Sequence, residues 1–355
     1  MPEQRLTVII PMAGRGKRLR PLTWTRPKPL VYVAGDAVLG HVLRAFQGLD
    51  PDRVRFVFII GYLGDQIRDY MAQQHPHWAA HYVEQRELLG QSHALWQARE
   101  YLQGPTLVLF VDTVTDADFR ALWPPPDEGR LWVREVEDPR RFGVVFTDPQ
   151  GRVTRIIEKP ATTEHRLAVV GIYYFPRGEA LAAAIEKQLQ RDLRTKGEYY
   201  LADAINILIQ EEGLVMRPVQ VETWLDAGTP ETVLALNRYL LDHGRDNTVE
   251  ALRPGAVVIP PVYIHPEAVV EDAVVGPYVT LGPGAIVRRS RVWDSILDAA
   301  AQVEDSQVQG SLLGRRARIV GQQGVFYVAD DSVLQPLLSP SSAPSEGHPP
   351  RRIEP

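Results

Sequence analysis

Short apolar runs alternate with amphipathic segments from the N-terminus to about Asp246. Residues 8–10, 54–60 and 106–111 are almost entirely aliphatic or aromatic, which is typical of buried strands. Between the last two runs, apolar residues from 94 to 102 fall on one face of a helix, with Ser92 as the expected N-cap. Apolar strands that alternate with helices predict a mostly parallel α/β sheet covered by helices on both faces.

The pattern between residues 129 and 175 differs, because its short strands are joined directly by turns such as the one at residues 148–151. We interpret this stretch as an antiparallel insertion that builds one wall of a cleft. The last helix of the domain is expected to begin with Thr229 as N-cap and Pro230 in its first turn. Helical spacing is present at residues 178–191, 200–212 and 229–244.

A different periodicity begins near residue 254, where aliphatic residues recur at a spacing of six with one step of five. Such a period, with small or acidic residues in tight turns, is typical of a parallel β-helix whose stacked aliphatic residues fill a three-sided coil. The period fades after Arg288, so an irregular β-rich segment is the alternative. The aliphatic positions are 264, 270, 275, 281 and 287. The expected units are a catalytic domain of residues 1–246, a hexapeptide-repeat β-helix of residues 250–328 and a Pro- and Ser-rich, disordered tail of residues 329–355.

Composition and charge exclude several classes of protein. The chain has 44 acidic and 39 basic residues and a net charge of −5, so no basic field exists to bind nucleic acid. It has no cysteine, which excludes disulfides, thiolate metal sites and cysteine nucleophiles. Neither a secretion signal nor an apolar run of membrane-spanning length is found, so we expect a cytoplasmic protein without a membrane partner.

The strongest chemical signal is the segment MAGRGKRLRP, which directly follows the first apolar run. Gly14 and Gly16 allow backbone conformations that turn N–H groups toward an anion. Four cations lie within six residues, and a glycine-rich turn with clustered cations at a strand's carboxyl end suits a polyphosphate. Lys28 lies between two prolines that restrict its backbone, which would help its ammonium group to meet a phosphate. The four cations are Arg15, Lys17, Arg18 and Arg20.

Two aspartates are candidate ligands of a divalent cation. Asp112 ends the third apolar run, and ligands of open α/β sheets bind beyond the carboxyl ends of the strands. Asp226 follows a second apolar pattern at residues 215–221. Because Mg²⁺ takes one or two carboxylates together with phosphate oxygens and water, the two aspartates and the phosphate loop suggest a metal–nucleotide site.

The order of these motifs resembles that of sugar-1-phosphate nucleotidylyltransferases, and the chain is most similar to glucose-1-phosphate thymidylyltransferases with a C-terminal left-handed β-helix. The resemblance implies a Rossmann-like, mostly parallel mixed sheet followed by that β-helix. The motifs are GRGKRLRPLT, RPKPL, QRELLG, Asp112, Phe142-Gly143, Glu158-Lys159-Pro160, Gly171 and WLDAGTP.

The resemblance also implies a reaction and a role for each matching position. The enzyme would join a nucleoside triphosphate, with dTTP or UTP favoured, to a sugar 1-phosphate, with glucose 1-phosphate favoured. Mg²⁺ would be the cofactor and the β-helix would assemble a homo-oligomer. The nucleotide would be bound by Ala13, Gly14, Gly16, Arg18, Gln85 and Gly90, and the sugar phosphate by Gly143, Glu158, Lys159, Gly171 and Trp224. Arg18, Lys28 and Lys159 would be the catalytic cations, and Asp112 and Asp226 would hold the metal ion.

Several positions depart from the pattern of that family. Lys17 replaces the usual Thr, Gln91 stands where Thr or Ala is common, and Val111 replaces a Gly before the metal aspartate. We expect Val111 to crowd the base or ribose and Gln91 to alter the choice of base. These departures concern the identity of the nucleotide more than the class of reaction.

Three other functions remain open at this point. The first is a mannose-1-phosphate guanylyltransferase, because that family has a similar glycine-rich loop, a KPL segment and a segment similar to the one around Asp226. A non-catalytic regulatory subunit that senses sugar phosphate would explain the unusual residues, although it would not need both aspartates. An acyltransferase in the β-helix would need a base, for which His265 is the only obvious candidate.

Overall fold

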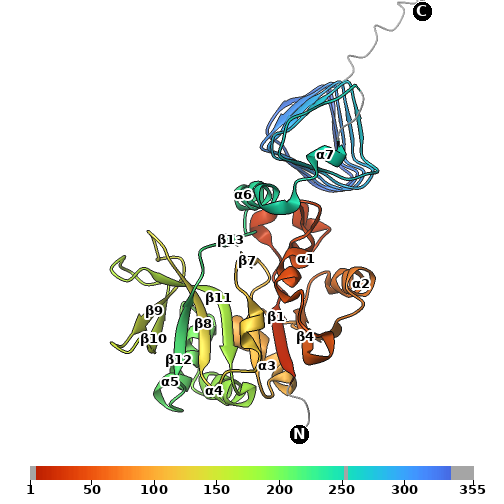
Figure 1. The fold of residues 1–355 in the computed structure, drawn as a ribbon. Coiled ribbons are helices and arrows are strands. Elements are labelled where there is room, and N and C mark those ends of the chain that lie inside the picture. Colours follow the sequence, from red (N-terminus) through yellow and green to blue (C-terminus); the bar gives the residue numbers. More distant parts are fainter. Residues whose placement is uncertain (1–4, 252–254, 337–355) are drawn as a thin grey trace, which may run out of the picture.

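The computed structural model describes residues 5–251 and 255–336, which form an α/β domain followed by a three-sided β-helix (Figure 1). In the first half of the α/β domain the strands are parallel, with neighbours in the order β6-β1-β4-β5. The apolar sequences of β1, β4 and β6 are buried on both faces, which confirms the parallel sheet predicted from the sequence, whereas the edge strand β5 is half-buried or exposed along its length. These strands are β1 (Leu6–Pro11), β4 (Val54–Ile60), β5 (Ala79–Glu84) and β6 (Thr106–Leu109).

The second half of the sheet is mostly antiparallel and continues from β6. Strand β11 pairs with β6, and its other partners are β8 and β9. The segment predicted as an antiparallel insertion therefore belongs to the same sheet, whose path ends at the hairpin of β9 and β10. The strands are β8 (Gly129–Glu135), β9 (Gly143–Thr147), β10 (Val153–Glu158), β11 (Leu167–Phe175) and β12 (Met216–Gln220).

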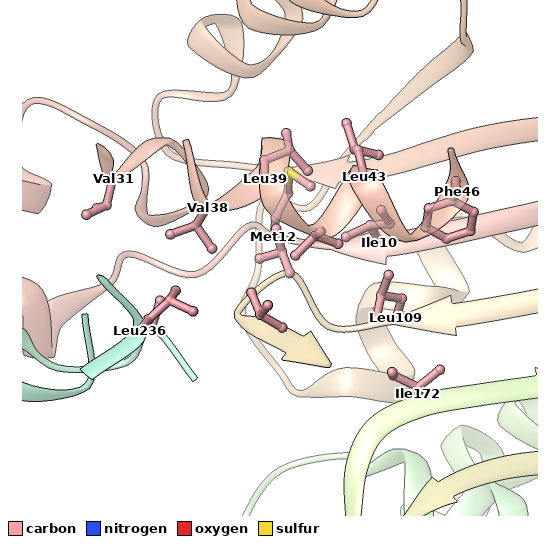
Figure 2. Packing of buried hydrophobic residues seen from close by; sticks show 14 of the residues in the cluster. Ile10, Met12, Val31, Val38, Leu39, Leu43, Phe46, Leu109, Ile172 and Leu236 are labelled. Atoms are coloured by element: carbon pink, nitrogen blue, oxygen red, sulfur yellow. The ribbon is translucent and has the colours of Figure 1, made fainter. Parts of the chain in front are cut away.

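Helices cover both faces of this sheet, as successive residues of β1 show. Ile10 packs with Leu39 and Leu43 on one face, whereas Ile9 packs with the helices of the other face. Figure 2 shows the first of these clusters, in which α1 lies over β1 and residues of α6 approach from the side. The helices of the first cluster are α1 (Val38–Leu43), α2 (Gly64–Gln74) and α6 (Pro230–Leu240), and those of the second are α3 (Gln91–Gln97), α4 (Gly178–Gln190) and α5 (Leu201–Gln210).

The helices α4, α5 and α6 confirm the periodicity seen in the sequence, but Ser92 is not the cap of α3. That helix begins at Gln91 after Gly90, so Ser92 lies inside its first turn. The Ser92 hydroxyl is occupied elsewhere, because it donates to the carbonyl of Tyr200 at 3.1 Å. At α6, Thr229 forms the predicted cap and accepts a hydrogen bond from the backbone N–H of Thr232.

Two short antiparallel pairs of strands complete the α/β domain. One is β2 (Tyr32–Val33) with β3 (Asp36–Ala37), and the other is β7 (Thr113–Thr115) with β13 (Trp224–Asp226). A π-helical turn (Leu241–Arg245) and α7 (Thr248–Ala251) then lead to the β-helix, which lies beyond α6 in Figure 1. Among the described residues, no helix is both long and apolar enough to span a bilayer.

The C-terminal part is a left-handed parallel β-helix with three faces. Its interior is a column of stacked aliphatic residues, in which Val270, Val287, Val303 and Ile319 occupy equivalent places in successive coils. The first face consists of the strands β14 (Val257–Val258), β17 (Val274–Val275), β20 (Arg291–Trp293), β23 (Gln307–Gln309) and β26 (Gln323–Gly324). The second face consists of β15 (Val262–Ile264), β18 (Val279–Leu281), β21 (Ile296–Leu297), β24 (Leu312–Leu313) and β27 (Tyr327–Val328). The third face consists of β16 (Val269–Glu271), β19 (Ile286–Arg288), β22 (Gln302–Glu304), β25 (Arg318–Val320) and β28 (Val333–Leu334).

The repeat does not stop at Arg288, where its sequence signal fades. The interior column continues with Val292, Leu297 and Val303, so two steps of five residues replace the expected six. Ile296 does not belong to the interior column, because its side chain points outward and packs into the core of the α/β domain. Strand β28 lies within the segment expected to be disordered, and residues 337–355 of that segment lie outside the described residues.

Candidate active site

The phosphate loop leaves the carboxyl end of β1 and borders a cavity of about 360 Å³. Gly16 adopts the left-handed conformation at the start of the 3₁₀ turn η1 (Lys17–Leu19), and its carbonyl accepts a hydrogen bond from the Thr23 hydroxyl at 2.8 Å. The loop is therefore tied to the segment that follows it. The cavity is lined by Pro11, Met12, Gly14, Gly16, Lys17, Arg18, Lys28, Pro29, Phe110, Val111, Asp112 and Gly228.

Lys28 and Asp112 meet across this cavity, as the candidate phosphate and metal residues should. Lys28 opens the 3₁₀ turn η3 (Lys28–Leu30), and its ammonium group forms an ion pair with the Asp112 carboxylate. Strand β6 ends at Leu109, so Asp112 lies in the turn between β6 and β7 rather than at the end of the strand itself. Val111 also lines the cavity, where it was expected to crowd the nucleotide.

Asp226 lies beside this cavity, at the end of the short strand β13. It does not directly follow β12, as the sequence pattern suggested, but ends β13 and pairs in register with Thr113. The backbone N–H of Ala227 donates to the carbonyl of Asp112 at 3.2 Å, which joins the two segments. The antiparallel pairing of β7 with β13 therefore brings together two segments, each with an aspartate, that are far apart in the sequence.

Gly228 lies between the side chains of Asp226 and Arg18. Its N–H donates to Asp226 Oδ2 at 3.0 Å. A Cβ atom placed on Gly228 would lie 2.5 Å from Asp226 Oδ2 and 2.9 Å from Arg18 Nη2. The sequence offered no reason to select Gly228, because the need for a glycine arises from the approach of two side chains from distant segments.

The residues expected to contact the base lie near the loop that follows β4. The backbone N–H of Gln85 donates to the carbonyl of Ile60 at 2.8 Å, and the Gln85 side chain is buried. Ala13 is also buried and packs against the neighbouring Gly61. Gly90 has φ +120°, and a Cβ there would lie 2.6 Å from backbone atoms of Tyr199, so this close approach requires glycine.

Gln91 and Ser92 connect this region to the start of α5. Gln91 Oε1 accepts a hydrogen bond from the N–H of Leu201 at 3.1 Å, and the carbonyl of Tyr199 accepts one from the N–H of Ser92 at 2.9 Å. The unusual Gln91 thus has a structural task in holding α5, which the comparison of motifs could not reveal.

Three of the candidate sugar residues lie where β9 begins and β10 ends. Glu158 pairs in register with Gly143, and a Cβ on that glycine would lie 3.0 Å from Glu158 Oε2. The ammonium group of Lys159 donates to the Tyr200 hydroxyl and lies 4.6 Å from the centre of the Tyr200 ring. No pattern in the sequence links Tyr200 to Lys159, so this contact could not be predicted.

Trp224 and Gly171 connect the sugar residues with the phosphate cavity. The Trp224 ring packs edge-to-face on Phe142 with centroids 4.7 Å apart, and Trp224 is in the same short strand as Asp226. Gly171 accepts a hydrogen bond from the N–H of Phe110 at 3.0 Å, two residues before Asp112. Within the described part of the chain, Gln85, Glu158 and Lys159 do not line the phosphate cavity itself.

Burial changes the protonation of the acid in this group. Burial raises the pKa of Glu158 from 4.5 to about 6, although the adjacent Lys159 opposes the shift. Burial lowers the pKa of Lys159, but the hydrogen bond to Tyr200 and the charge of Glu158 outweigh it, so that pKa is raised. Lys159 is therefore a cation at neutral pH, and Glu158 is ionised only above about pH 6.

We expect the stability of the protein to depend on pH through Glu158. Because its pKa is higher in the folded chain, the folded state binds the extra proton and loses stability as pH rises between 4.5 and about 6. A neutral Glu158→Gln variant should have an unfolding free energy about 1–2 kcal/mol above that of the parent near pH 7.5. In urea titrations this difference should vanish near pH 4.5, and an equal difference at both pH values would contradict the assignment.

The chain was compared with known proteins. The family model for nucleotidyl transferases matches residues 7–243. The bifunctional protein GlmU of Methanocaldococcus jannaschii is 33% identical over 238 residues, which cover 67% of this chain and 55% of that protein. A glucose-1-phosphate thymidylyltransferase of Streptomyces griseus is 29% identical over 359 residues, covering 97% of this chain and 96% of that protein.

A solved structure of a UDP-glucose pyrophosphorylase complexed with UDP-glucose shares the fold, with a TM-score of 0.58 and 17% identity over 68% of this chain and 100% of that one. The family model covers the sheet, both layers of helices and every candidate site residue from Ala13 to Asp226. The chain belongs to the nucleotidyl transferase family.

Proposed function

We propose that the protein transfers a nucleotidyl group from a nucleoside triphosphate to a sugar 1-phosphate and releases pyrophosphate. The observation that carries this proposal is the convergence of Arg18, Lys28 and Asp112 around one cavity, with Asp226 beside Gly228, which lines the same cavity. Two cations and two carboxylates at the carboxyl end of a parallel sheet suit a polyanionic substrate and a divalent cation. The neighbouring Glu158 and Lys159 offer a hydroxyl acceptor and a phosphate partner for the sugar.

In this reaction an oxygen of the sugar phosphate attacks the α-phosphorus of the triphosphate. The new bond joins that oxygen to the α-phosphorus, and the bond from the α-phosphorus to the bridging oxygen of the β-phosphate breaks. Since the sugar phosphate is already ionised, no general base is needed. The chain instead has to align two anions that repel each other and to offset the charge that develops on the pyrophosphate.

Arg18, Lys28 and Lys159 carry out this task through fixed positive charge. Arg18 and Lys28 border the cavity next to the glycine-rich turn, where the triphosphate would bind. Lys159 is held by the hydroxyl and the ring of Tyr200, so its ammonium group has a fixed position before a substrate phosphate would bind. A cation that is oriented in advance stabilises the transition state without reorganisation.

Asp112 and Asp226 fit a magnesium ion in this proposal. Among the described residues, no group of three or more His, Asp or Glu side chains could hold a metal. Two carboxylates completed by phosphate oxygens and water are nevertheless the usual environment of Mg²⁺ in phosphoryl-transfer sites. When bound, the ion would neutralise charge on the phosphates. Without it, Lys28 compensates the charge of Asp112.

The substrates within this class are the finer part of the proposal. We favour dTTP or UTP with glucose 1-phosphate, because the relatives include a glucose-1-phosphate thymidylyltransferase and a UDP-glucose pyrophosphorylase. Association of copies through the β-helix and a cytoplasmic location are part of the same proposal.

A panel assay for released pyrophosphate tests the proposal. dTTP, UTP, GTP, ATP and CTP would each be mixed with glucose, mannose or N-acetylglucosamine 1-phosphate, with and without Mg²⁺. We expect Mg²⁺-dependent release with a pyrimidine triphosphate and glucose 1-phosphate. A preference for GTP with mannose 1-phosphate would change the substrates but not the reaction. The absence of release from every pair would favour a regulatory subunit that only binds sugar phosphate.

A further inference from the structure

The segment that carries Lys28 is held from the β-helix through Arg26. The Arg26 side chain is buried, and its Nη1 donates to the carboxylate of Asp298, which is buried as well. The same Nη1 lies 3.3 Å from the carbonyl oxygen of Leu30, the last residue of the turn that Lys28 begins. One guanidinium group therefore fixes the end of this turn to a side chain of the other domain.

A second carboxylate of the β-helix completes the cluster. Asp330 Oδ1 lies 3.9 Å from Arg26 Nη2, and Asp330 Oδ2 accepts hydrogen bonds from the Thr25 hydroxyl at 2.9 Å and from Arg315 Nε at 3.1 Å. Two arginines thus balance two carboxylates. Because buried charges are costly unless their partners are well placed, this cluster constrains the position of Arg26 strongly.

Both carboxylates are oriented by their own coils before they meet Arg26. Asp298 Oδ1 accepts a hydrogen bond from the N–H of Ala299 at 2.6 Å, and Asp330 Oδ1 accepts one from the N–H of Arg315 at 2.7 Å. These residues project from the same edge of the stacked coils. The β-helix therefore presents a rigid pair of anions toward the segment with Arg26.

Apolar packing around the cluster joins the same two surfaces. Ile296 and Leu312 point out of the β-helix and belong to one buried cluster with Leu22 and Val31, which flank the Lys28 turn. On its other side the turn packs closely against the phosphate loop, since a Cβ placed on Gly16 would lie 3.2 Å from the Cβ of Lys28. A shift of the turn would therefore be transmitted to the phosphate loop.

We propose that the β-helix positions Lys28 for catalysis, with Asp298 and Asp330 holding Arg26 and Arg26 holding the turn. Arg26 is a positioning residue in this arrangement, because it acts on Lys28 and lines no part of the phosphate cavity among the described residues. The inference rests on the proposed function for its kinetic consequences. It makes the β-helix a part of the active site's support.

The test is an Asp298→Asn variant of the full chain, assayed at a temperature where circular dichroism shows the fold intact. We expect kcat to fall about tenfold with the KM for the sugar phosphate within about twofold, since a small displacement of a catalytic cation affects mainly the transition state. If this variant does not fold, Asp330→Asn removes the second carboxylate and carries the same expectation. Unchanged kcat in a folded variant would overturn the inference.

Asp294→Asn is the matched control, because Asp294 also forms an ion pair between the β-helix and the α/β domain. Its partner Arg238 is on α6, away from the Lys28 turn. This variant should keep the kcat of the parent, and an equal loss would mean that any weakening of the interface suffices. When Asp298→Asn is added to a Lys28→Ala variant, kcat should fall little further. If the two substitutions instead lower kcat by the product of their separate effects, the proposed route through Lys28 is contradicted.

A second measurement does not depend on turnover. Acetic anhydride labelling followed by mass spectrometry reports how accessible the Lys28 amine is, with the exposed Lys196 as internal reference. If the loss of Asp298 releases Lys28 from its ion pair with Asp112, Lys28 should be labelled about threefold faster in Asp298→Asn than in the parent. Equal labelling would overturn the inference even if the parent released no pyrophosphate, and that lack of release would separately contradict the proposed function.

Discussion

Replacing Asp226 by asparagine is expected to lower kcat by about 10²- to 10³-fold. Asp226 Oδ2 is held by the N–H of Gly228, and the side chain lies next to Arg18. Asparagine preserves the shape but removes the charge that would hold Mg²⁺ against the triphosphate. The loss should therefore be partly reversed at high Mg²⁺ concentration, which pyrophosphate-release assays over a Mg²⁺ titration would show.

Asp69→Asn is the control for the change in net charge, because Asp69 is exposed on α2. It should behave as the parent does at every Mg²⁺ concentration. Near-normal turnover of Asp226→Asn at low Mg²⁺ would refute the assignment of this carboxylate to the metal ion, whatever the identity of the nucleotide.

A single methyl group on Gly228 should remove most activity with little effect on stability. The added Cβ would lie 2.5 Å from Asp226 Oδ2 and 2.9 Å from Arg18 Nη2, so both groups must move away from their present positions. Both are ends of side chains that can swing toward solvent, so we expect the unfolding free energy to change by less than about 1 kcal/mol. We expect kcat/KM to fall about 10²-fold, because two charged groups lose their alignment.

Gly90→Ala provides the contrast in the same assays. There the added Cβ would lie 2.6 Å from backbone atoms of Tyr199, and φ is +120°. Since a backbone segment cannot swing away, this variant should lose stability in thermal unfolding as well as activity. A Gly228→Ala protein with parental kcat/KM would show that Arg18 and Asp226 need not keep their present arrangement.

The sequence was most informative where one segment carries a complete signal. The glycine-rich turn and the cations that would bind phosphate lie in the same short segment, and the aliphatic spacing from Ile264 to Val287 predicts the β-helix. The alternation of strands and helices similarly predicted the sheet and both of its helical layers. In each case a local pattern is sufficient because the physical cause of the structure is local.

Features that depend on the meeting of distant segments could not be predicted from such patterns. The antiparallel pairing of β7 with β13 brings the segments of Asp112 and Asp226 together, and no local pattern predicts a pairing of two three-residue strands. The requirement for glycine at Gly228 and the contact of Tyr200 with Lys159 arise in the same way. Ser92 was misassigned as a cap because α3 begins one residue before it, after Gly90, and its hydroxyl donates to the carbonyl of Tyr200, which precedes α5.

The hydrogen bonds between the start of α3 and the start of α5 have a consequence for protein engineering. Gln91 and Ser92 follow directly on Gly90, and their partners are Leu201 and the two tyrosines that precede it. One of those tyrosines, Tyr200, orients the amine of Lys159. A library that varies residues 90–92 to accept a different nucleobase would therefore also disturb Lys159 and the residues proposed to bind the sugar 1-phosphate. Its variants should be selected for activity with the nucleoside triphosphate and the sugar 1-phosphate together.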